Sequence, residues 1–240
     1  MFQRNLYVLG GIVGSFAIAS LFLNSFVSVK AINTDPRASQ TSTADIPNFN
    51  QKEMKTAVFA GGCFWGTEAV FEHLKGVSNV VSGYSGGSAA TANYEAVSSG
   101  RTEHAESIKI TYDPSQISYE KLLEIYFHVA HDPTQLNRQG SDRGTQYRSA
   151  IFFTNREQQQ IAAAYIERLN QDKSFSKPVV TQLVPLENFY AAEDYHQDFI
   201  VHNPNYPYVV VHDLPKLAQL KEKFPEIYSY NLYQEKSKSK

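Results

Sequence analysis

The spacing of apolar and polar positions between residues 55 and 185 predicts a mixed order of strands and helices. Ile108 and Ile110 alternate with polar residues, as expected of a strand with one buried face. After Ser118 the apolar residues instead recur every three or four positions, which is typical of a helix with one buried side. Applied along this region, the pattern predicts strands at residues 55–60, 77–84, 106–112, 148–154 and 179–185, and helices at residues 67–74, 118–130 and 155–170.

Two of these helices also have local start signals. Ser118 and Asn155 precede them, and the side-chain oxygen of serine or asparagine can accept a hydrogen bond from a free N–H group of the first helical turn. Gln158 follows Asn155 by three residues, which is the spacing of a capping box. Both positions therefore predict helix N-termini.

The first six elements follow the order strand, helix, strand, strand, helix, strand, which is the ferredoxin-like order. This βαββαβ core predicts an α+β fold, a two-layer sandwich in which helices pack on one face of a mostly antiparallel sheet. Residues 186–212 contain many aromatic residues, prolines and turn residues but no clear periodicity. We expect long structured loops there, and loops of this kind are often functional.

The N-terminal region has a different pattern. Arg4 is the only charged residue before the end of an apolar run over residues 6–29. A positive start and an apolar centre are typical of a secretory signal peptide, here residues 1–31 with cleavage after Ala31. The run is also just long enough to span a bilayer, so the alternative is an uncleaved membrane anchor formed by residues 6–29. In both cases we expect the folded domain to be exported to a periplasm or another extracytoplasmic space.

Composition divides the rest of the chain. Residues 32–52 are polar and predict a flexible linker, residues 53–228 hold the predicted catalytic domain, and residues 229–240 form a polar tail. With 42% hydrophobic and 19% charged residues, the composition is ordinary for a soluble globular domain. The formal net charge of -2 gives no indication of a nucleic-acid partner. We expect the chain to be a monomer.

The chain contains a single cysteine, Cys63, within the sequence Gly-Gly-Cys-Phe-Trp-Gly at residues 61–66. A lone cysteine is an inert core residue, a reactive nucleophile or one half of an intermolecular link. The predicted strand before it and helix after it place Cys63 near a helix N-terminus, where free N–H groups favour the reactive thiolate. The aromatic residues that follow favour an apolar pocket around the sulfur. We therefore interpret Cys63 as a nucleophile.

The pentapeptide Gly-Cys-Phe-Trp-Gly closely resembles the signature of the A-type peptide methionine sulfoxide reductases. Six further blocks resemble that family in the same order, and the resemblance extends over residues 55–208. These blocks are Gly83-Tyr84-Ser85-Gly86-Gly87, Tyr94-Glu95-Ala96-Val97, residues 100–106 with His104-Ala105-Glu106, His131-Asp132-Pro133-Thr134-Gln135, Gly144-Thr145-Gln146-Tyr147-Arg148-Ser149 and Ala192-Glu193-Asp194-Tyr195-His196. Any one block is weak evidence, but their order around the rare Cys-Phe-Trp sequence is highly specific.

The resemblance implies an enzyme that reduces methionine-S-sulfoxide in oxidised proteins or peptides, and also free methionine-S-sulfoxide, to methionine. Cys63 would attack the sulfoxide sulfur and be left as sulfenic acid, which must be reduced again. Glu106 would protonate the oxygen, because a carboxyl group in an apolar site has a raised pKa. From its spacing alone, Glu106 would be a solvated acid at the start of a strand.

Four aromatic residues are assigned to substrate binding by the resemblance alone. Phe64 and Trp65 would surround the methyl group of the substrate, the alternative being ordinary packing at a helix start. Tyr94 and Tyr147 would donate hydrogen bonds to the sulfoxide oxygen, a role that suits a side chain with an apolar ring and a polar tip.

Two polar residues with assigned positions have open alternatives. Asp142 either lies in the substrate-binding site or caps a turn of its loop, and His196 either lines the site or braces it.

The sequence His-x-x-His-Asp at residues 128–132 has loosely ligand-like spacing. Because no second cluster of ligands accompanies it, we interpret these histidines as structural or surface residues rather than a metal site. We expect no bound cofactor.

The chain departs from many members of the family because it has no further cysteine near its C-terminus. In those relatives a second thiol attacks the sulfenic acid. Here we expect an external thiol reductant, either a thioredoxin-like protein or glutathione with a glutaredoxin. Glutathione would be scarce outside the cytoplasm, which favours a donor with a thioredoxin fold.

Two other classes of function stay open at this point. A thiol peroxidase or a cysteine hydrolase would also use a reactive cysteine, and would show peroxide-dependent turnover or ester cleavage. A binding or scaffold module would keep its function when Cys63 is replaced by serine.

Overall fold

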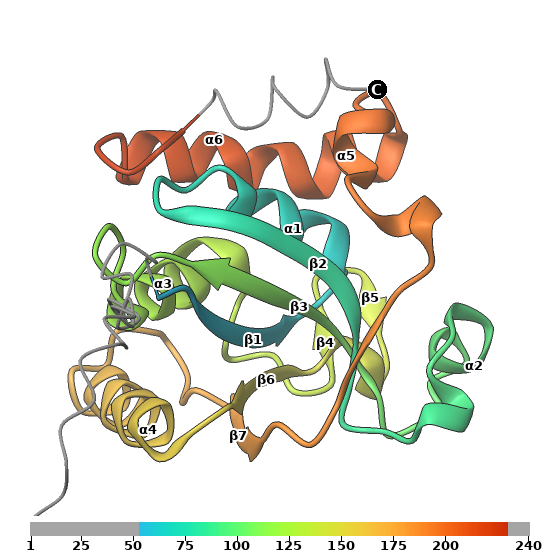
Figure 1. The fold of residues 1–240 in the computed structure, drawn as a ribbon, viewed down its shortest axis with the longest axis horizontal. Helices are drawn as coiled ribbons and strands as arrows, with labels where there is room; N and C mark the ends of the chain where they lie inside the picture. Colours follow the sequence, from blue (N-terminus) through green and yellow to red (C-terminus); the bar gives the residue numbers. More distant parts are fainter. Residues whose placement is uncertain (1–52, 230–240) are drawn as a thin grey trace, which may run out of the picture. The chain divides into compact units, whose positions relative to one another are not determined.

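The computed structural model describes residues 53–229, and Figure 1 shows how their helices and strands are arranged. Six strands form one sheet in the order β7-β6-β1-β3-β2-β8. They are β1 (Lys55–Gly61), β2 (Val77–Ser85), β3 (Ala105–Tyr112), β6 (Ser149–Phe153), β7 (Gln182–Pro185) and β8 (Phe189–Ala191); β4 (Arg138–Gln139) and β5 (Asp142–Arg143) form a separate hairpin. The α-helices are α1 (Phe64–Glu72), α2 (Tyr94–Ser98), α3 (Tyr119–Ile125), α4 (Arg156–Gln171), α5 (Phe199–His202) and α6 (Leu214–Lys223). Short helical turns are η1 (Ala89–Thr91), η2 (Tyr126–Ala130), η3 (Thr145–Tyr147), η4 (Asp194–His196) and η5 (Val209–Asp213), of which η2 and η5 are π-helical.

The four central strands confirm the ferredoxin-like order predicted from the sequence. β1 pairs antiparallel with both β3 and β6, and β2 pairs antiparallel with β3. Helix α1 connects β1 to β2, and α3 lies between β3 and β6 in the chain. The register places Phe59 opposite Ile108 and Tyr84 opposite Glu106. The fold is therefore the predicted α+β class.

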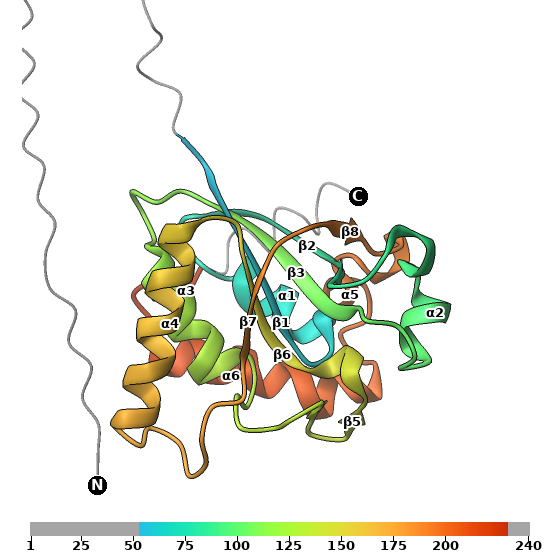
Figure 2. The same ribbon diagram turned by 90° about the horizontal axis from the view of Figure 1, so that it is seen from below.

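Helices α1, α3, α4 and α6 share one hydrophobic core with the sheet. Figure 1 shows α6 alongside α1, and Figure 2 shows α3 beside α4. At the centre of this core the ring of Phe59 packs against Phe71 and Tyr126, with centroid distances of 5.7 and 4.8 Å. Farther out, Phe127 stacks on Tyr165 of α4 at 5.4 Å. The helices thus form the predicted layer on one face.

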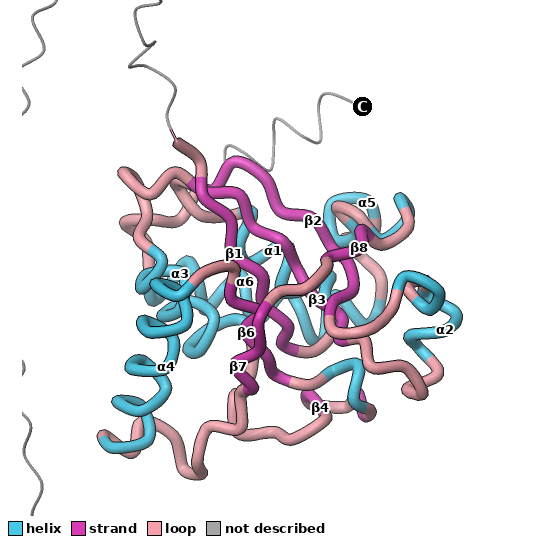
Figure 3. The backbone as a smooth tube through the Cα atoms, turned by 60° about the horizontal axis from the view of Figure 1, so that its bottom comes forward, coloured by secondary structure: helices cyan, strands magenta, loops and turns pink. Residues whose placement is uncertain are grey.

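The two edge strands show that the sheet is strongly rolled. β7 and β8 lie at opposite edges, yet only residues 186–188 connect them. This connection spans at most about 14 Å, whereas the edge strands of a flat sheet of this width would be about 24 Å apart. Figure 3 shows the connection crossing the sheet. Leu186 and Phe189 there pack on a smaller apolar cluster of the second face.

Both predicted helix caps are confirmed. The Oγ of Ser118 accepts a hydrogen bond from the N–H of Lys121 at 3.1 Å, and the Oδ1 of Asn155 accepts one from the N–H of Gln158 at 2.9 Å. The helix predicted for residues 118–130 changes at Tyr126 from α3 into the π-helical turn η2.

Two predicted boundaries are corrected. Helix α1 begins at Phe64, three residues before its predicted start, because the N–H of Phe64 finds an acceptor in Glu106 on a distant strand. The strand predicted for residues 179–185 begins only at Gln182, because the N–H groups of Val179 and Val180 bond to other parts of the chain.

Residues 186–212 form the expected structured loops, which contain β8, η4 and α5. Helix α6 has no counterpart among the predicted elements. No helix within residues 53–229 is both long and apolar enough to cross a membrane. The predictions for residues 1–31 and 32–52, and for all but the first residue of the tail, lie outside the described residues.

Candidate active site

Cys63 lies where β1 turns into α1. The strand ends at Gly61, and Gly62 has a φ of 90°, a left-handed conformation that glycine adopts without strain. A Cβ at Gly62 would also stand only 2.5 Å from the Cγ of Gln139. Cys63 then forms the N-cap of α1 and is half-buried. The two glycines therefore allow the tight turn that presents the cysteine.

A buried polar network supports this turn. The Nδ1 of His131 donates a hydrogen bond to the carbonyl oxygen of Tyr126 at 2.9 Å, and its Nε2 bonds to the Oγ of Ser149 at 2.7 Å. The hydroxyl of Tyr126 donates to the carbonyl oxygen of Ala60 at 2.8 Å. A Cβ at Gly61 would lie 2.9 Å from the Cγ of His131. Burial lowers the pKa of His131 to about 4, so the ring is neutral and braces the turn.

The histidine pair with ligand-like spacing does not converge on a common site. His131 belongs to the network under the turn, whereas His128 stacks on the ring of Phe175 with a centroid distance of 5.6 Å. Among residues 53–229, no group of three or more His, Cys, Asp or Glu side chains is placed to hold a metal ion.

Glu106 lies on β3 beside the start of α1. The backbone N–H of Phe64 donates a hydrogen bond to its Oε2 at 3.1 Å, and the residue is only 3% exposed. Burial raises the pKa of this carboxyl group to about 8; the N–H of Phe64 opposes the rise, and the charge of Asp142 adds to it. Glu106 is therefore protonated at neutral pH and can act as an acid.

The same surroundings favour the neutral form of Cys63. Burial raises the pKa of its thiol well above the ordinary value, and the carboxyl groups of Glu106 and Asp213 raise it further when they are ionised. The backbone N–H of Trp65 and the ammonium group of Lys216 lower it, but these effects are smaller. The backbone N–H groups at the helix N-terminus thus favour the thiolate, as the sequence indicates, but desolvation of the sulfur has a larger and opposite effect on its pKa.

Trp65 is held in an aromatic cluster beside Cys63. Its indole ring stacks on Phe199 at a centroid distance of 3.6 Å with 6° between the planes. The indole N–H donates a hydrogen bond to the Nδ1 of His196 at 3.1 Å. Tyr206 and Tyr208 meet the ring edge-on at 6.1 and 6.0 Å. Residues of the aromatic loop region, which comprises residues 186–212, thus fix the orientation of Trp65.

Phe64 and His196 lie deeper than Trp65, and each is only 1% exposed. Phe64 packs against Tyr84 at 5.8 Å and against His196 at 4.9 Å. The imidazole of His196 also lies 4.5 Å from the ring of Tyr94. Phe64 therefore underlies the site, and His196 occupies the position of a brace between Trp65 and Tyr94.

The two predicted hydroxyl donors lie near Cys63 and Glu106. Burial raises the pKa of both Tyr94 and Tyr147, and the charges of Glu106 and Cys63 raise it further for each. Asp142 on β5 accepts a hydrogen bond from the hydroxyl of Tyr208. The charge of Asp142 also raises the pKa of Glu106, so Asp142 lies close to this cluster. The structure thus brings the predicted site residues together around one sulfur.

Several residues of the site were not identified individually from the sequence. Glu193 accepts hydrogen bonds from the hydroxyl of Tyr84 and from the backbone N–H of Tyr94, both at 2.9 Å, and so ties its loop to α2. Glu193 lies in a block that resembles the family and Tyr208 lies in the aromatic loop region, so the sequence contained an indication that each could belong to the site. Asp213, at the end of η5, had none.

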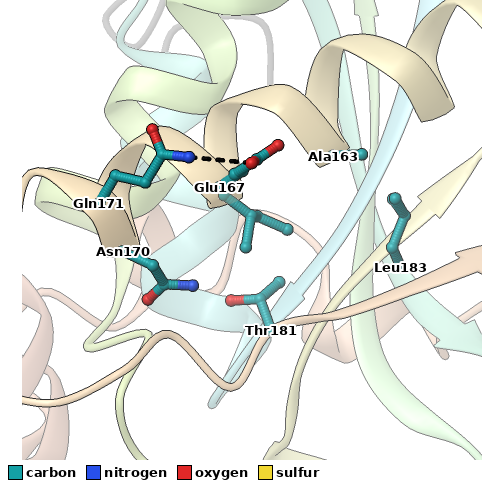
Figure 4. A pocket seen from close by; sticks show the side chains of 7 residues that line it. Ala163, Glu167, Asn170, Gln171, Thr181 and Leu183 are labelled. Carbon is teal, nitrogen blue, oxygen red and sulfur yellow. Dashed lines mark hydrogen bonds between the residues drawn. The ribbon is translucent and has the colours of Figure 1, made fainter.

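A separate hollow lies between α4 and β7, as Figure 4 shows. Two of its lining residues on α4 are joined by a hydrogen bond from the Nε2 of Gln171 to the Oε1 of Glu167 at 2.9 Å. It is lined by Ala163, Ile166, Glu167, Asn170, Gln171, Thr181 and Leu183, none of which belongs to the cluster around Cys63.

Comparison with known proteins places this geometry in a family. The sequence profile of peptide methionine sulfoxide reductases matches residues 55–228. The chain is 58% identical over 175 residues to peptide methionine sulfoxide reductase MsrA 2 of Mesorhizobium japonicum, an alignment that covers 73% of this chain and 90% of that protein. It is 58% identical over 170 residues to peptide methionine sulfoxide reductase MsrA 2 of Synechocystis, which covers 71% of this chain and 79% of that protein.

Solved structures show the same fold. The reduced form of Mxr1 from Saccharomyces cerevisiae superposes with a TM-score of 0.61 at 32% identity, covering 65% of this chain and 90% of that one. Methionine sulfoxide reductase A of Corynebacterium diphtheriae superposes with a TM-score of 0.57 at 35% identity, covering 65% of this chain and 77% of that one.

Proposed function

Because the chain belongs to the peptide methionine sulfoxide reductase family, and is thus an oxidoreductase that reduces methionine sulfoxide, we propose that Cys63 and Glu106 perform this reduction together. The observation that supports the proposal best is the pairing at the start of α1. There a cysteine caps the helix and a buried carboxyl group accepts the next backbone N–H. No other residue supplies a thiol, because the chain has one cysteine.

The proton is supplied by Glu106. Its pKa of about 8 leaves it protonated at neutral pH, so it can donate to the sulfoxide oxygen as the substrate enters. Protonation makes the substrate sulfur a better target, and the resulting carboxylate can accept the proton of Cys63. Burial of both groups thus prepares a proton exchange that begins only when a sulfoxide is present.

The oxygen atom is then transferred to Cys63. The thiolate attacks the substrate sulfur and forms a bond between the two sulfur atoms. The hydroxyl oxygen then moves from the substrate sulfur to the Sγ of Cys63, so that the S–O bond of the substrate and the bond between the two sulfur atoms break while a new S–O bond to Cys63 forms. The substrate sulfur gains an electron pair and becomes the thioether of methionine, while Cys63 is oxidised to sulfenic acid. The proton that left the thiol is balanced by the proton carried on the sulfenic acid oxygen.

The surrounding residues select the S epimer. The oxygen must face Glu106 and the hydroxyls of Tyr94 and Tyr147, while the methyl group faces the indole of Trp65. With Cys63 approaching the sulfur from a fixed direction, only one arrangement of oxygen, methyl group and side chain fits. These contacts address the sulfoxide group alone, so free methionine-S-sulfoxide is a substrate as well as oxidised proteins and peptides.

An external thiol restores the enzyme. With one cysteine, the chain cannot resolve the sulfenic acid by an internal disulfide. The reductant is a thioredoxin-like protein, with glutathione and a glutaredoxin as the alternative. No bound cofactor takes part in these steps.

The test is single-turnover reduction of separate S and R methionine sulfoxide peptides by the native protein and by Cys63→Ser. We expect one equivalent of the S peptide to be consumed per Cys63, none of the R peptide, and none by the variant. Mass spectrometry should then find one added oxygen on Cys63 and no internal crosslink, and dithiothreitol should restore turnover.

Other outcomes would point elsewhere. If neither epimer is reduced, or if Cys63→Ser is as active as the native protein, the proposed mechanism is wrong. Peroxide-dependent turnover without sulfoxide reduction would then favour a thiol peroxidase. A Cys63→Ser variant that keeps the function of the native protein would favour a binding module.

A further inference from the structure

A buried charge pair lies at the junction of η5 and α6, and the reduction steps proposed above do not use it. Asp213 is 0% exposed, and its Oδ1 lies 3.4 Å from the Nζ of Lys216. Its other oxygen, Oδ2, has no hydrogen-bond partner among the described residues. Burial of a carboxylate with one unpartnered oxygen lowers the free energy of unfolding. We therefore expect Asp213 to have a function that offsets this loss of stability.

The pair presses against the first turn of the helix that Cys63 caps. A Cβ at Gly66 would lie 2.1 Å from the Oδ1 of Asp213 and 2.8 Å from the Nζ of Lys216. Gly66 is the third residue of α1, so both charges lie within one helical turn of Cys63. The absence of a side chain at Gly66 is what admits the pair to this position.

The two charges act on Cys63 in opposite directions. The carboxylate of Asp213 raises the pKa of the thiol, and the ammonium group of Lys216 lowers it. Burial, and to a smaller extent Asp142, raises the pKa of Asp213 above its ordinary value, while Lys216 and His212 limit this rise. The ammonium group of Lys216, which contacts the Oδ1 of Asp213, therefore favours the ionised form of this carboxyl group.

Other titratable groups also face the sulfur. Glu106 approaches from β3, and the hydroxyls of Tyr94, Tyr147 and Tyr208 approach from α2, η3 and the aromatic loop. Burial raises the pKa of Glu106 to about 8, so it is largely uncharged at neutral pH. Asp213 differs from Glu106 because it contacts the ammonium group of Lys216, and it is therefore the carboxylate whose negative charge acts on Cys63 near neutral pH.

We propose that Asp213, held in place by Lys216, keeps Cys63 in the thiol form while the site is empty and so protects it from peroxide. This inference rests on the proposed function of Cys63 as the nucleophile. The step that it suppresses is attack of a Cys63 thiolate on hydrogen peroxide, in which an S–O bond forms, the O–O bond breaks and water is released. A second peroxide would carry the sulfenic acid to sulfinic acid, which is not restored by simple thiols. Because the chain has no second cysteine to trap the sulfenic acid, such protection has a clear value.

The test measures the ionisation of Cys63 in the full chain without methionine sulfoxide. Iodoacetamide reacts only with the thiolate, and the single cysteine makes its rate unambiguous. Asp213→Asn should shift the midpoint of the rate against pH down by about one unit, which is a tenfold gain in thiolate near neutrality. Lys216→Met should shift it up by a similar amount, and Lys216→Arg should stay near the native value.

Peroxide supplies the functional readout. Asp213→Asn should accumulate sulfinic acid on Cys63 about tenfold faster than the native protein, and Lys216→Met more slowly, as measured by mass spectrometry. A merely structural role predicts that both variants loosen the site and react faster. Opposite shifts therefore support the proposal, and shifts of the same sign or no shift overturn it.

If Asp213→Asn does not fold, Lys216→Met decides, because Lys216 is partly exposed and its loss is milder. An unchanged or lowered midpoint in that variant, with Lys216→Arg native-like, overturns the proposal. Failure of the proposed function is distinguishable, since sulfoxide reduction would then be absent while the alkylation midpoints still move in opposite directions.

Discussion

At Glu106, burial of the carboxyl group keeps it protonated near neutral pH and also lowers the free energy of unfolding of the protein. Burial raises the pKa of this group from an ordinary value of 4.5 to about 8, so the native protein keeps a proton that the unfolded chain releases. The stability linked to this proton is fully present below about pH 4.5 and is lost as the pH rises to about 8. The active site thus gains a neutral acid near pH 7 at the expense of the free energy of unfolding.

Replacement of Glu106 by glutamine separates these two effects. Glu106→Gln keeps an oxygen for the N–H of Phe64 but removes the titration. We expect its free energy of unfolding to exceed that of the native protein by about 3 kcal/mol at pH 7, with the difference vanishing near pH 4.5. Its reduction rate should fall by about 10²–10⁴, and the native rate should decline above about pH 8. Urea unfolding and single-turnover rates across this range would measure both.

Glu103→Gln is a matched control, because Glu103 is an exposed acid just before the same strand. Its stability should change by less than about 0.5 kcal/mol and its rate should be unaffected. A Glu106→Gln protein that is less stable at pH 7, or as active as the native one, would contradict the assignment of Glu106 as a buried acid.

At the scale of elements, two glycines with positive φ make a controlled comparison of the turn before Cys63. Gly62 and Gly140 have φ values of 90° and 58°. A Cβ at Gly140 would meet nothing within 4 Å, whereas one at Gly62 would collide with Gln139. Gly140→Ala should cost about 1 kcal/mol of stability and leave turnover intact.

Gly62→Ala should lower the free energy of unfolding by more than Gly140→Ala does. It should also lower turnover at least tenfold, because a small displacement of a reacting atom has a large effect on the rate. The sulfur would move because the turn must yield to Gln139. Denaturant unfolding and single-turnover assays of the two variants would compare these effects. Equal losses in both would mean that the turn tolerates a side chain and does not fix Cys63.

The same elements show which parts of the fold the sequence can predict. Ser118 and Asn155 cap helices through contacts three residues away, so their signals are local and both predictions are confirmed. The true start of α1 depends on Glu106, which is far away in sequence, so no local pattern could place it. Strand β8 forms only because three residues find the free edge of β2, and such short pairing leaves no periodicity.

The residues of the candidate site also divide into those that the sequence can predict and those that it cannot. Cys63, Glu106 and the two tyrosines could be proposed from the sequence because each lies in a block of recognisable residues. Asp213 was not, because its effect depends on η5 packing against the bare backbone of Gly66. Nothing near Asp213 in the sequence indicates that contact.

At the scale of the whole molecule, the number of cysteines and the place where the enzyme works are linked. If Cys63 reacts as proposed, the single cysteine means that every turnover ends with a sulfenic acid that another molecule must reduce. If the enzyme is exported, the reductant must work outside the cytoplasm as well. The N-terminal segment therefore bears on the identity of the donor, although it is remote from the chemistry in the sequence.

We expect residues 1–31 to direct export and to be removed, so that the mature chain begins at Ile32. Intact-mass measurement of the protein from fractions of a bacterium with a periplasm would test this. Ala31→Trp is the matched control, because signal cleavage requires a small residue there, and it should leave the full-length chain in the membrane fraction. A native chain that keeps Met1 in the membrane would instead make residues 6–29 an anchor, with the donor still extracytoplasmic. A full-length native chain in the cytoplasm would contradict both forms of export and would restore glutathione with a glutaredoxin as the expected reductant, because that thiol pool is cytoplasmic.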